Sequence, residues 1–379
     1  MTPRTPASTA LPYCIVLALI PLLGAGMAWG GLWIVGAFLF TFLATPLMDT
    51  LVPLNASNAD PATEDDAIKA HLWLTWFWVP CQVALIVGLL VVAGDGTLAG
   101  WELWAMAATL GLATGGIGIT YAHELMHQRN RFERWLAEVL MCSTLYGHFC
   151  IEHVFGHHLH VATPRDPASA RPGESLYRFL PRTVIGTLRS AWAIQSEQLR
   201  RRELPLWSRQ NAFWRYGAWT AAWITLAYLV AGLTGLGVFL VQAVVAVLLL
   251  ETVNYLEHYG LQRRLLENGR YEPTREHHSW NANHRFTNYM LINLQRHSDH
   301  HRHPNRRFPL LQAHDPDTAP QLPYGYSWMV VLALLPPIWF RVMDPRVAAW
   351  RARHGDIRGT GGPNDGSASA LPAGAVAAE

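Results

Sequence analysis

The chain has 379 residues, a formal net charge of +2, 51% hydrophobic residues and only 15% charged residues. A soluble domain carries about a quarter charged residues, so this composition indicates a chain that lies largely in lipid. The small net charge gives no electrostatic reason to expect nucleic-acid binding. The four cysteines form no CxxC pair, so neither a disulfide framework nor a thiolate metal site is expected.

Six apolar stretches have about the 20 residues that a helix needs to cross a bilayer. They predict an all-α integral membrane protein with spans near residues 11–28, 31–48, 72–93, 102–122, 213–233 and 236–256. The short Trp29–Gly31 connection predicts a hairpin between the first two spans. A cleaved signal peptide is the alternative interpretation of residues 1–28. The apolar stretch 327–340 contains two prolines and is too short to span, so we expect it at the interface or packed on the bundle.

Basic residues are confined to one set of segments. None lies in the three short loops near 29–30, 94–101 and 234–235. Because cytoplasmic loops carry an excess of Lys and Arg, both termini and both long loops are predicted to lie in the cytoplasm. Residues 1–354 are expected to form a single membrane domain, and the Gly-, Ala-, Ser- and Pro-rich residues 355–379 a disordered tail.

Fifteen of the 18 histidines lie between His123 and His303, in clusters with helical spacing. The clusters are HELMH at 123–127, EHVFGHH at 152–158 and HSDHH at 297–301, and a single His258 follows the sixth span. Spacings of three and four place side chains on one face of a helix. Neutral imidazole is the commonest metal ligand, and nine imidazoles exceed the needs of one tetrahedral ion. The pattern predicts two ions with four or five ligands each, and it leaves Fe, Cu, Zn and Ni open.

These clusters resemble the histidine boxes of membrane di-iron hydroxylases and desaturases, and within that class the chain is similar to the alkane monooxygenases. The matching segments are HELMH, EHVFGHH, VATPRDPASARPGESLYRF (161–179), NYLEHYGL (254–261), HHSWNANH (277–284) and LQRHSDHH (294–301). The resemblance implies two iron ions, O2 as co-substrate and a bacterial inner-membrane location. Its ligands would fall on His123, His127, His153, His157, His158, His258, His297, His300 and His301.

Four carboxylates adjoin these histidines and are candidates to orient the imidazoles through their second nitrogen. They are Glu124, Glu152, Glu257 and Asp299. A helix-capping or solvated role is equally compatible with each of them. We expect His277, His278 and His284 to have a structural or supporting role, and no catalytic residue beyond the metal ligands is predicted.

The function that the resemblance implies is O2-dependent hydroxylation of a medium-to-long-chain n-alkane to a 1-alkanol. The alternatives are a hydroxylase of fatty-acyl or aryl methyl groups, similar to xylene monooxygenase, a desaturase, and a haem or metal carrier. HELMH also matches the H-E-x-x-H pattern of a zinc protease, with Glu124 as general base. That interpretation needs only three protein ligands and leaves most of the clustered histidines without a role.

The chain contains no CxxC pair and no GxGxxG fingerprint, so its electrons must come from elsewhere. The resemblance implies rubredoxin, supplied by an NAD(P)H-dependent rubredoxin reductase. Arg302, Arg306 and Arg307 lie beside the third box and are predicted to bind this acidic carrier. The other arginine cluster, 200–202, is equally compatible with contact to anionic membrane lipid.

Overall fold

The computed structural model describes residues 9–98 and 100–354, where every regular element is helical apart from two isolated β-bridges. The expected tail at 355–379 lies outside the described residues. The principal helices are η2 (Leu11–Ala18), α1 (Leu19–Trp29), α2 (Gly36–Leu39), η4 (Phe40–Ala44), α3 (Thr45–Leu51), α4 (Lys69–Asp95), α5 (Trp101–Ala113), η6 (Thr114–Gly118), α6 (Ile119–Met126), α7 (Arg131–Cys142), α8 (Phe149–Glu152), η7 (His153–His157), α9 (His158–His160), α10 (Leu176–Arg201), α11 (Ala212–His258), α12 (Arg285–Met290), α13 (His297–Arg302), α14 (Tyr326–Ala333) and α15 (Pro336–His354). Short 3-10 turns lie at Gly31–Trp33 (η3), Asp65–Ile68 (η5), Glu276–His278 (η8) and Phe308–Leu310 (η9).

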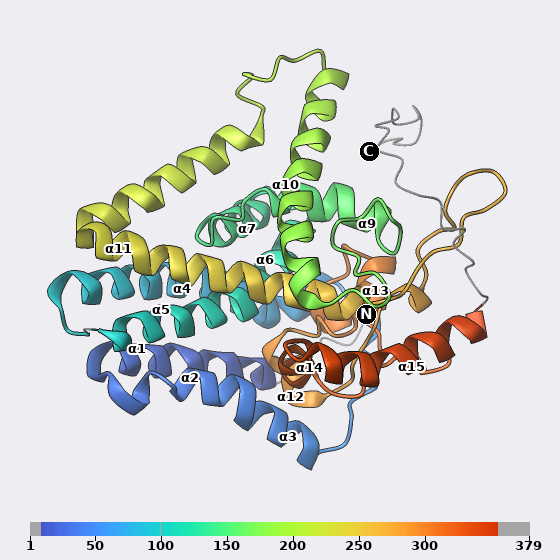
Figure 1. Ribbon diagram of the computed structural model, residues 1–379, viewed down its shortest axis with the longest axis horizontal. Coiled ribbons are helices and arrows are strands. Elements are labelled where there is room, and N and C mark those ends of the chain that lie inside the picture. Colours follow the sequence, from blue (N-terminus) through green and yellow to red (C-terminus); the bar gives the residue numbers. More distant parts are fainter. Residues whose placement is uncertain (1–8, 99, 355–379) are drawn as a thin grey trace.

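Five helical stretches are long and apolar enough to cross a membrane: Thr9–Trp29, Gly31–Leu51, Asp65–Asp95, Trp101–Met126 and Ala212–His258. The first four coincide with the first four predicted spans. The fifth, α11, has 47 residues and is broken at Ala231 and Gly232, so that its two arms fall on the last two predicted spans (Figure 1). The break lies slightly before the predicted loop at 234–235 because Gly232 adopts a φ of 58°, which favours glycine.

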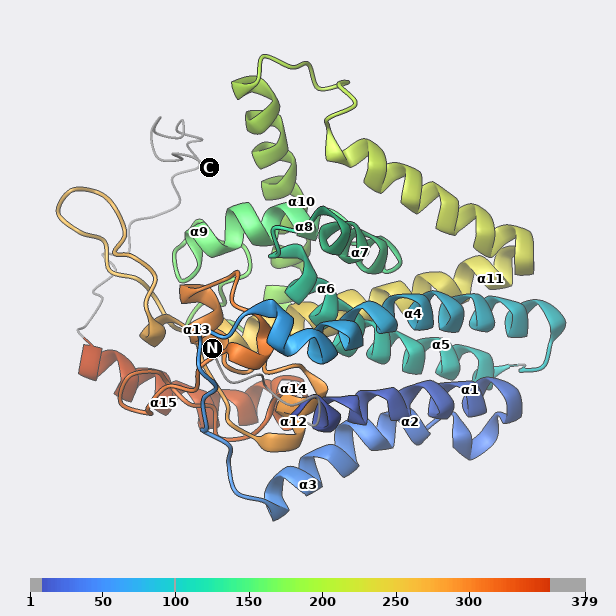
Figure 2. The same cartoon turned by 180° about the vertical axis from the view of Figure 1, so that it is seen from behind.

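The apolar helices lie side by side as a bundle. α1, α4, α5 and the second arm of α11 run in nearly the same direction in both views (Figures 1 and 2). Gly115 permits a close approach of two helices in the bundle, since a Cβ there would lie 2.7 Å from the Cα of Ala246 in α11. The predicted hairpin between the first two spans is confirmed by Gly30, whose φ of 62° reverses the chain.

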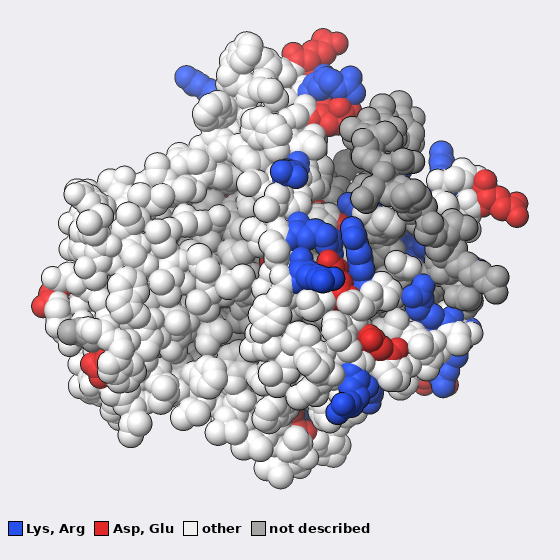
Figure 3. All heavy atoms as spheres, in the orientation of Figure 1, with Lys and Arg blue, Asp and Glu red and all other residues white. Residues whose placement is uncertain are grey.

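α10 crosses the bundle direction instead of following it (Figure 1). It exposes Ile185, Leu188 and Trp192, which are spaced along one face at helical intervals. Charged side chains gather over the end of the molecule where α10, α13 and α15 lie, and the surface over α4, α5 and the turn of α11 is almost uncharged (Figure 3). This division of the surface is that of a multi-pass membrane protein with one polar end.

The apolar stretch 327–340 does not continue as one helix. α14 packs against α11 and buries Tyr326, Met329 and Ala333. A new helix, α15, starts at Pro336 because proline cannot extend the preceding helix but suits the first turn of the next. The expectation that this stretch packs on the bundle is therefore confirmed.

Candidate metal centre

The first histidine group combines five imidazoles from three separate parts of the chain. His123 and His127 lie at the end of α6, and His300 comes from α13. His153 and His158 complete the group, and one ligand atom from each of the five lies within 4.8 Å of the others. We call this set the five-histidine group.

The second group lies directly beside the first and contains four buried imidazoles. His297 and His301 are one helical turn apart on α13, His258 ends α11, and His157 comes from η7. We call this set the four-histidine group. The rings of His158 and His301, one from each group, have centroids only 4.5 Å apart.

The imidazoles of both groups turn the same type of nitrogen towards one another. The Nε2 atoms of His158 and His300 are 3.0 Å apart in the first group, and those of His297 and His301 are 3.0 Å apart in the second. The Nε2 atoms of His123, His127 and His157 are buried and have no hydrogen-bond partner in the part of the chain that the structure describes. Converging, unsatisfied nitrogens fit a metal ion in each group.

Burial keeps these imidazoles in the form that binds metals. Burial lowers the pKa well below the usual histidine value for His127, His153, His158, His297, His300 and His301. Neighbouring imidazoles lower the pKa further, because two adjacent positive charges repel each other. The rings are therefore neutral and available as ligands.

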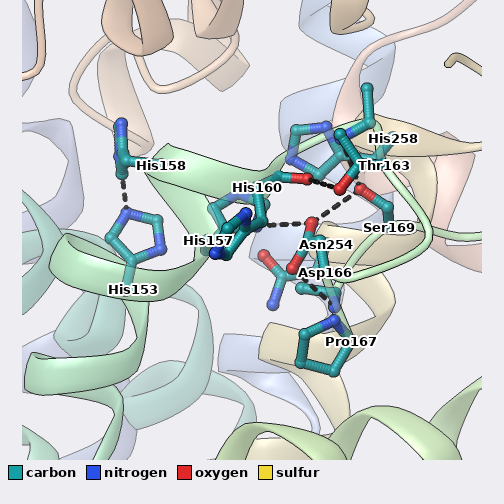
Figure 4. Close-up of polar contacts among 12 residues, drawn as sticks. His153, His157, His158, His160, Thr163, Asp166, Pro167, Ser169, Asn254 and His258 are labelled. Carbon is teal, nitrogen blue, oxygen red and sulfur yellow. Dashed lines mark hydrogen bonds and ion pairs between the residues drawn. The ribbon is translucent and has the colours of Figure 1, made fainter. Parts of the chain in front are cut away.

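A π-helical turn divides the second histidine box between the two groups. The α-helical spacing predicted from the sequence would place His153 and His157 on the same face. Residues His153–His157 instead form the π-helix η7, whose wider turn aligns His153 with His158, their Nε2 atoms being 3.1 Å apart (Figure 4). His157 then points to the other group. Single π-turns of this kind are frequent at functional sites.

Asp166, which was not among the predicted site residues, contacts the ring nitrogen of His157 that faces away from the four-histidine group. Its Oδ2 lies 2.9 Å from the Nδ1 of His157 (Figure 4) and also accepts a hydrogen bond from the hydroxyl of Ser169 at 2.6 Å. Burial raises the pKa of Asp166, but the contacts with His157 and Ser169 outweigh it and hold that pKa below its usual range. This contact fixes the tautomer of His157 and leaves its Nε2 free for a metal. The available signal was an Asp-Pro turn nine residues after His157.

Of the four predicted orienting carboxylates, only Glu257 contacts a clustered imidazole. Its Oε2 lies 3.3 Å from the Nε2 of His297, and its Oε1 accepts a hydrogen bond from the hydroxyl of Tyr326 at 2.9 Å. Nε2 is the nitrogen that faces the centre of the group. Glu257 therefore lies on the metal-facing side of His297. The prediction that it contacts the second nitrogen, behind the ring, is wrong.

The other three carboxylates have different surroundings. Glu124 accepts a hydrogen bond from the side chain of Gln128 at 3.2 Å. Asp299 binds the guanidinium of Arg306 with both oxygens at 2.6 Å. Glu152 is fully buried next to Gly156, where a Cβ would lie 2.8 Å from its Oε1. The described contacts place none of these carboxylates on a clustered imidazole, so the predicted orienting role is not supported for them.

The arginines beside the third box are mostly internal. Arg307 is 8% exposed and forms ion pairs with Glu133 at 2.9 Å and Asp65 at 2.8 Å. Arg306 is occupied by Asp299, and only Arg302 has an exposed side chain. The prediction that all three arginines face a partner protein is therefore wrong for Arg306 and Arg307. Both lie near the third box, but they pair with carboxylates of the chain itself.

His277 and His278 lie outside both groups, near Glu272. The Nδ1 of His278 accepts a hydrogen bond from the main-chain nitrogen of Arg275 at 2.9 Å, so its Nε2 carries the proton and donates to Glu272 at 3.3 Å. Glu272 also pairs with Arg264 at 3.2 Å. Both ring nitrogens of His278 are used by protein partners, which gives this third set a structural role.

A narrow apolar cavity of about 60 Å³ leads from the bundle to the histidines. Its lining includes His123 and His153 from the five-histidine group and His297 from the four-histidine group. All three π-helical segments of the described chain contribute to its wall: Thr41 and Phe42 from η4, Gly115 and Gly116 from η6, and His153 from η7. An apolar molecule in this cavity would end at the candidate metal centre.

Comparison with known proteins decides the family. A model of the fatty acid desaturase family matches residues 99–333. Alkane 1-monooxygenase 2 of Pseudomonas aeruginosa is 42% identical to this chain over 84% of the chain and 85% of its own length. The chain belongs to the alkane 1-monooxygenase family. Alkane 1-monooxygenase of Acinetobacter baylyi is 36% identical over 86% of this chain. The hydroxylase component of xylene/toluene monooxygenase from Pseudomonas putida is 31% identical over 89% of this chain.

Membership of the alkane 1-monooxygenase family makes the chain a membrane oxidoreductase, and its histidine groups indicate a metal centre. The resemblance found in the sequence is thus confirmed. The zinc-protease alternative fails, because Glu124 is bonded to Gln128 and directed to Arg307 instead of to the histidines.

Proposed function

We propose that the enzyme uses O2 to hydroxylate the terminal carbon of a medium-to-long n-alkane at two iron ions, one in each histidine group. The observation that carries this proposal is the apolar cavity that ends at His123, His153 and His297. The balanced reaction takes R–CH3, O2, two electrons and two protons to R–CH2OH and water. A terminal C–H bond is neither acidic nor polar enough for acid–base catalysis, so a redox metal must supply the oxidising power.

The nine clustered histidines are the proposed ligands, with five for one ion and four for the other. The chain itself contributes binding, orientation and exclusion of water. The apolar walls at Phe42, Ile119 and Leu250 hold the hydrocarbon, and Gly115 and Gly116 complete the wall. Asp166 keeps His157 in its binding tautomer.

The proposed electron donor is rubredoxin, reduced by an NAD(P)H-dependent reductase. His158 is the one clustered histidine that is not fully buried, so a carrier on that side of the molecule has the shortest path to the metals. The adjacent Leu159 is 61% exposed and offers an apolar contact. Arg302, with an exposed guanidinium on the same α13 helix that holds His300, supplies the charge for an acidic carrier.

The proposed location is the bacterial inner membrane, with the histidine groups and both termini in the cytoplasm. The gathering of charged side chains at the histidine end supports this orientation (Figure 3), because cytoplasmic segments carry the excess of Lys and Arg. A cysteine is introduced either at Arg209, just before α11, or at Asp95, at the end of α4, positions that the proposal puts on opposite sides of the membrane. Each variant is treated with a membrane-impermeant thiol reagent in intact cells. The proposal requires that only the Asp95 position reacts without lysis.

The function is tested with membranes supplied with rubredoxin, its reductase, NADH and a series of n-alkanes of increasing length. We expect 1-alkanols to accumulate, in an amount that depends on chain length. The hydroxylase component of xylene/toluene monooxygenase is also similar to this chain, so p-xylene and a fatty-acid methyl ester are run in parallel. Turnover of p-xylene without any alkanol would replace the alkane by an aryl methyl group as the substrate.

A further inference from the structure

A second cavity, of about 400 Å³, contains none of the nine clustered histidines in its lining. It is bordered by the first turn of η2, the start of α4 and the segment from α12 to η9. Its lining contains no Asp or Glu. The polar side chains in the lining include Tyr13, Asn55, Ser57, His71, Tyr289 and Arg296. The cavity is thus rich in hydrogen-bond donors and has no negative charge of its own.

Arg296 brings a buried positive charge to this cavity. The side chain is 4% exposed, and its guanidinium donates to four neutral oxygens: the main-chain carbonyls of Asn55 at 3.2 Å, Ser57 at 2.9 Å and Leu311 at 2.5 Å, and the side-chain oxygen of Asn58 at 3.4 Å. Its Nε has no hydrogen-bond partner within residues 9–98 and 100–354. Among the described residues no carboxylate pairs with it, since nearby Asp299 is taken by Arg306. A buried charge without a counterion is unfavourable, so the cavity is suited to an anion.

Two further donors face the same space. The hydroxyl oxygen of Tyr13 accepts a hydrogen bond from the amide of Asn293 at 2.8 Å, which leaves the hydroxyl proton for a ligand. Asn55 also lines the cavity, and its side-chain oxygen accepts from the hydroxyl of Ser57 at 2.6 Å, so this bond leaves the Asn55 amide hydrogens for a ligand. A guanidinium together with neutral donors is the usual arrangement for binding an oxyanion.

We propose that this cavity binds the phosphate headgroup of an anionic phospholipid. It lies at the ends of two stretches long enough to cross the membrane, Thr9–Trp29 and Asp65–Asp95, where headgroups are found. Its volume far exceeds the ~30 Å³ share of one water molecule, so it holds more than a bare ion. Pro12, Ile68 and Leu310 form an apolar side for the glycerol end of the lipid. Free phosphate offers the same oxygens, and the test separates the two.

The test changes the charge of the cavity at its exposed rim. Ser57 is exposed and keeps its main-chain bond to Arg296 in any variant, so Ser57→Glu and the matched Ser57→Gln differ only in charge. Each full-length protein is stripped of lipid in neutral detergent and titrated with dioleoylphosphatidylglycerol or dioleoylphosphatidylcholine. Native mass spectrometry counts the bound lipid. Tyr13→Phe, which removes one donor and keeps the ring, is the second variant.

We expect the wild type and Ser57→Gln to bind phosphatidylglycerol about tenfold more tightly than phosphatidylcholine, a difference of about 1.4 kcal/mol. Ser57→Glu should lose most of this preference, and Tyr13→Phe part of it. An unchanged preference in Ser57→Glu, or none in the wild type, overturns the proposal. A third outcome also overturns it: inorganic phosphate protects the wild type from thermal unfolding, protects Ser57→Glu less, and phosphatidylglycerol gives no protection. The site would then bind the free ion and not the lipid.

Discussion

His157 and His158 are neighbours in the chain, yet their imidazoles belong to different histidine groups. The π-turn of η7 separates them, and Asp166 holds His157 in place from behind. One peptide bond therefore links the two candidate metal positions. A shift of this turn would move ligands of both groups at once.

Single alanine substitutions at these two residues should affect different ions. His157→Ala removes one of four imidazoles and His158→Ala one of five, so each variant should fall from about two irons per chain towards about one. Iron is measured by mass spectrometry of purified protein, and hydroxylation should be lost in both variants. His160→Ala, close in sequence but in neither group, is the control and should keep its iron. Loss of all iron in either single variant would show that the groups do not bind independently.

Asp166 should matter through His157. Replacing it by alanine leaves the Nδ1 of His157 without its partner at 2.9 Å, and loss of such a contact typically lowers metal affinity about 10- to 100-fold. Asp166→Asn retains an oxygen that can accept the same hydrogen bond and should keep much more iron. Competition with a chelator, read as iron per chain, ranks the three proteins. If Asp166→Ala holds iron as tightly as the wild type, the contact has no role in ligand orientation.

The histidine clusters could be predicted from the sequence because helical spacing is a local property of the chain, whereas the expectation that all nine bind metal came from the family resemblance. The division of the nine between two groups depended on the π-turn at His153–His157, which periodicity does not reveal. Asp166 was missed because it reaches His157 through a loop that folds back at Ala162, where φ is 58°. Arg306 and Arg307 were assigned to a partner because proximity in sequence says nothing of the carboxylates that the fold brings to them.

Arg307 should stabilise the fold of the enzyme and should not contribute to the binding of rubredoxin. It is buried between Glu133 and Asp65, and removing one partner of a buried ion pair typically costs about 3–5 kcal/mol. Arg307→Met should therefore lower the thermal unfolding temperature. The double variant Arg307→Met with Glu133→Leu removes both charges and should regain much of the loss. Equal stability of the single variant and the wild type would contradict the role assigned to this pair.

Arg302 is the remaining arginine of the three that can meet an acidic carrier, because its side chain is exposed and its one carboxylate contact among the described residues, with Glu276, is 3.7 Å long. Arg302→Glu should raise the rubredoxin concentration needed for half-maximal rate while leaving the maximal rate unchanged. The effect should shrink with added salt, since the Debye length falls from ~10 Å at 0.1 M to ~3 Å at 1 M. Arg209→Glu, an exposed arginine on the α10–α11 connection, is the matched charge reversal and should leave the rubredoxin dependence as it is. If both reversals raise the requirement equally, rubredoxin responds to net charge alone, and the docking site near His158 is wrong.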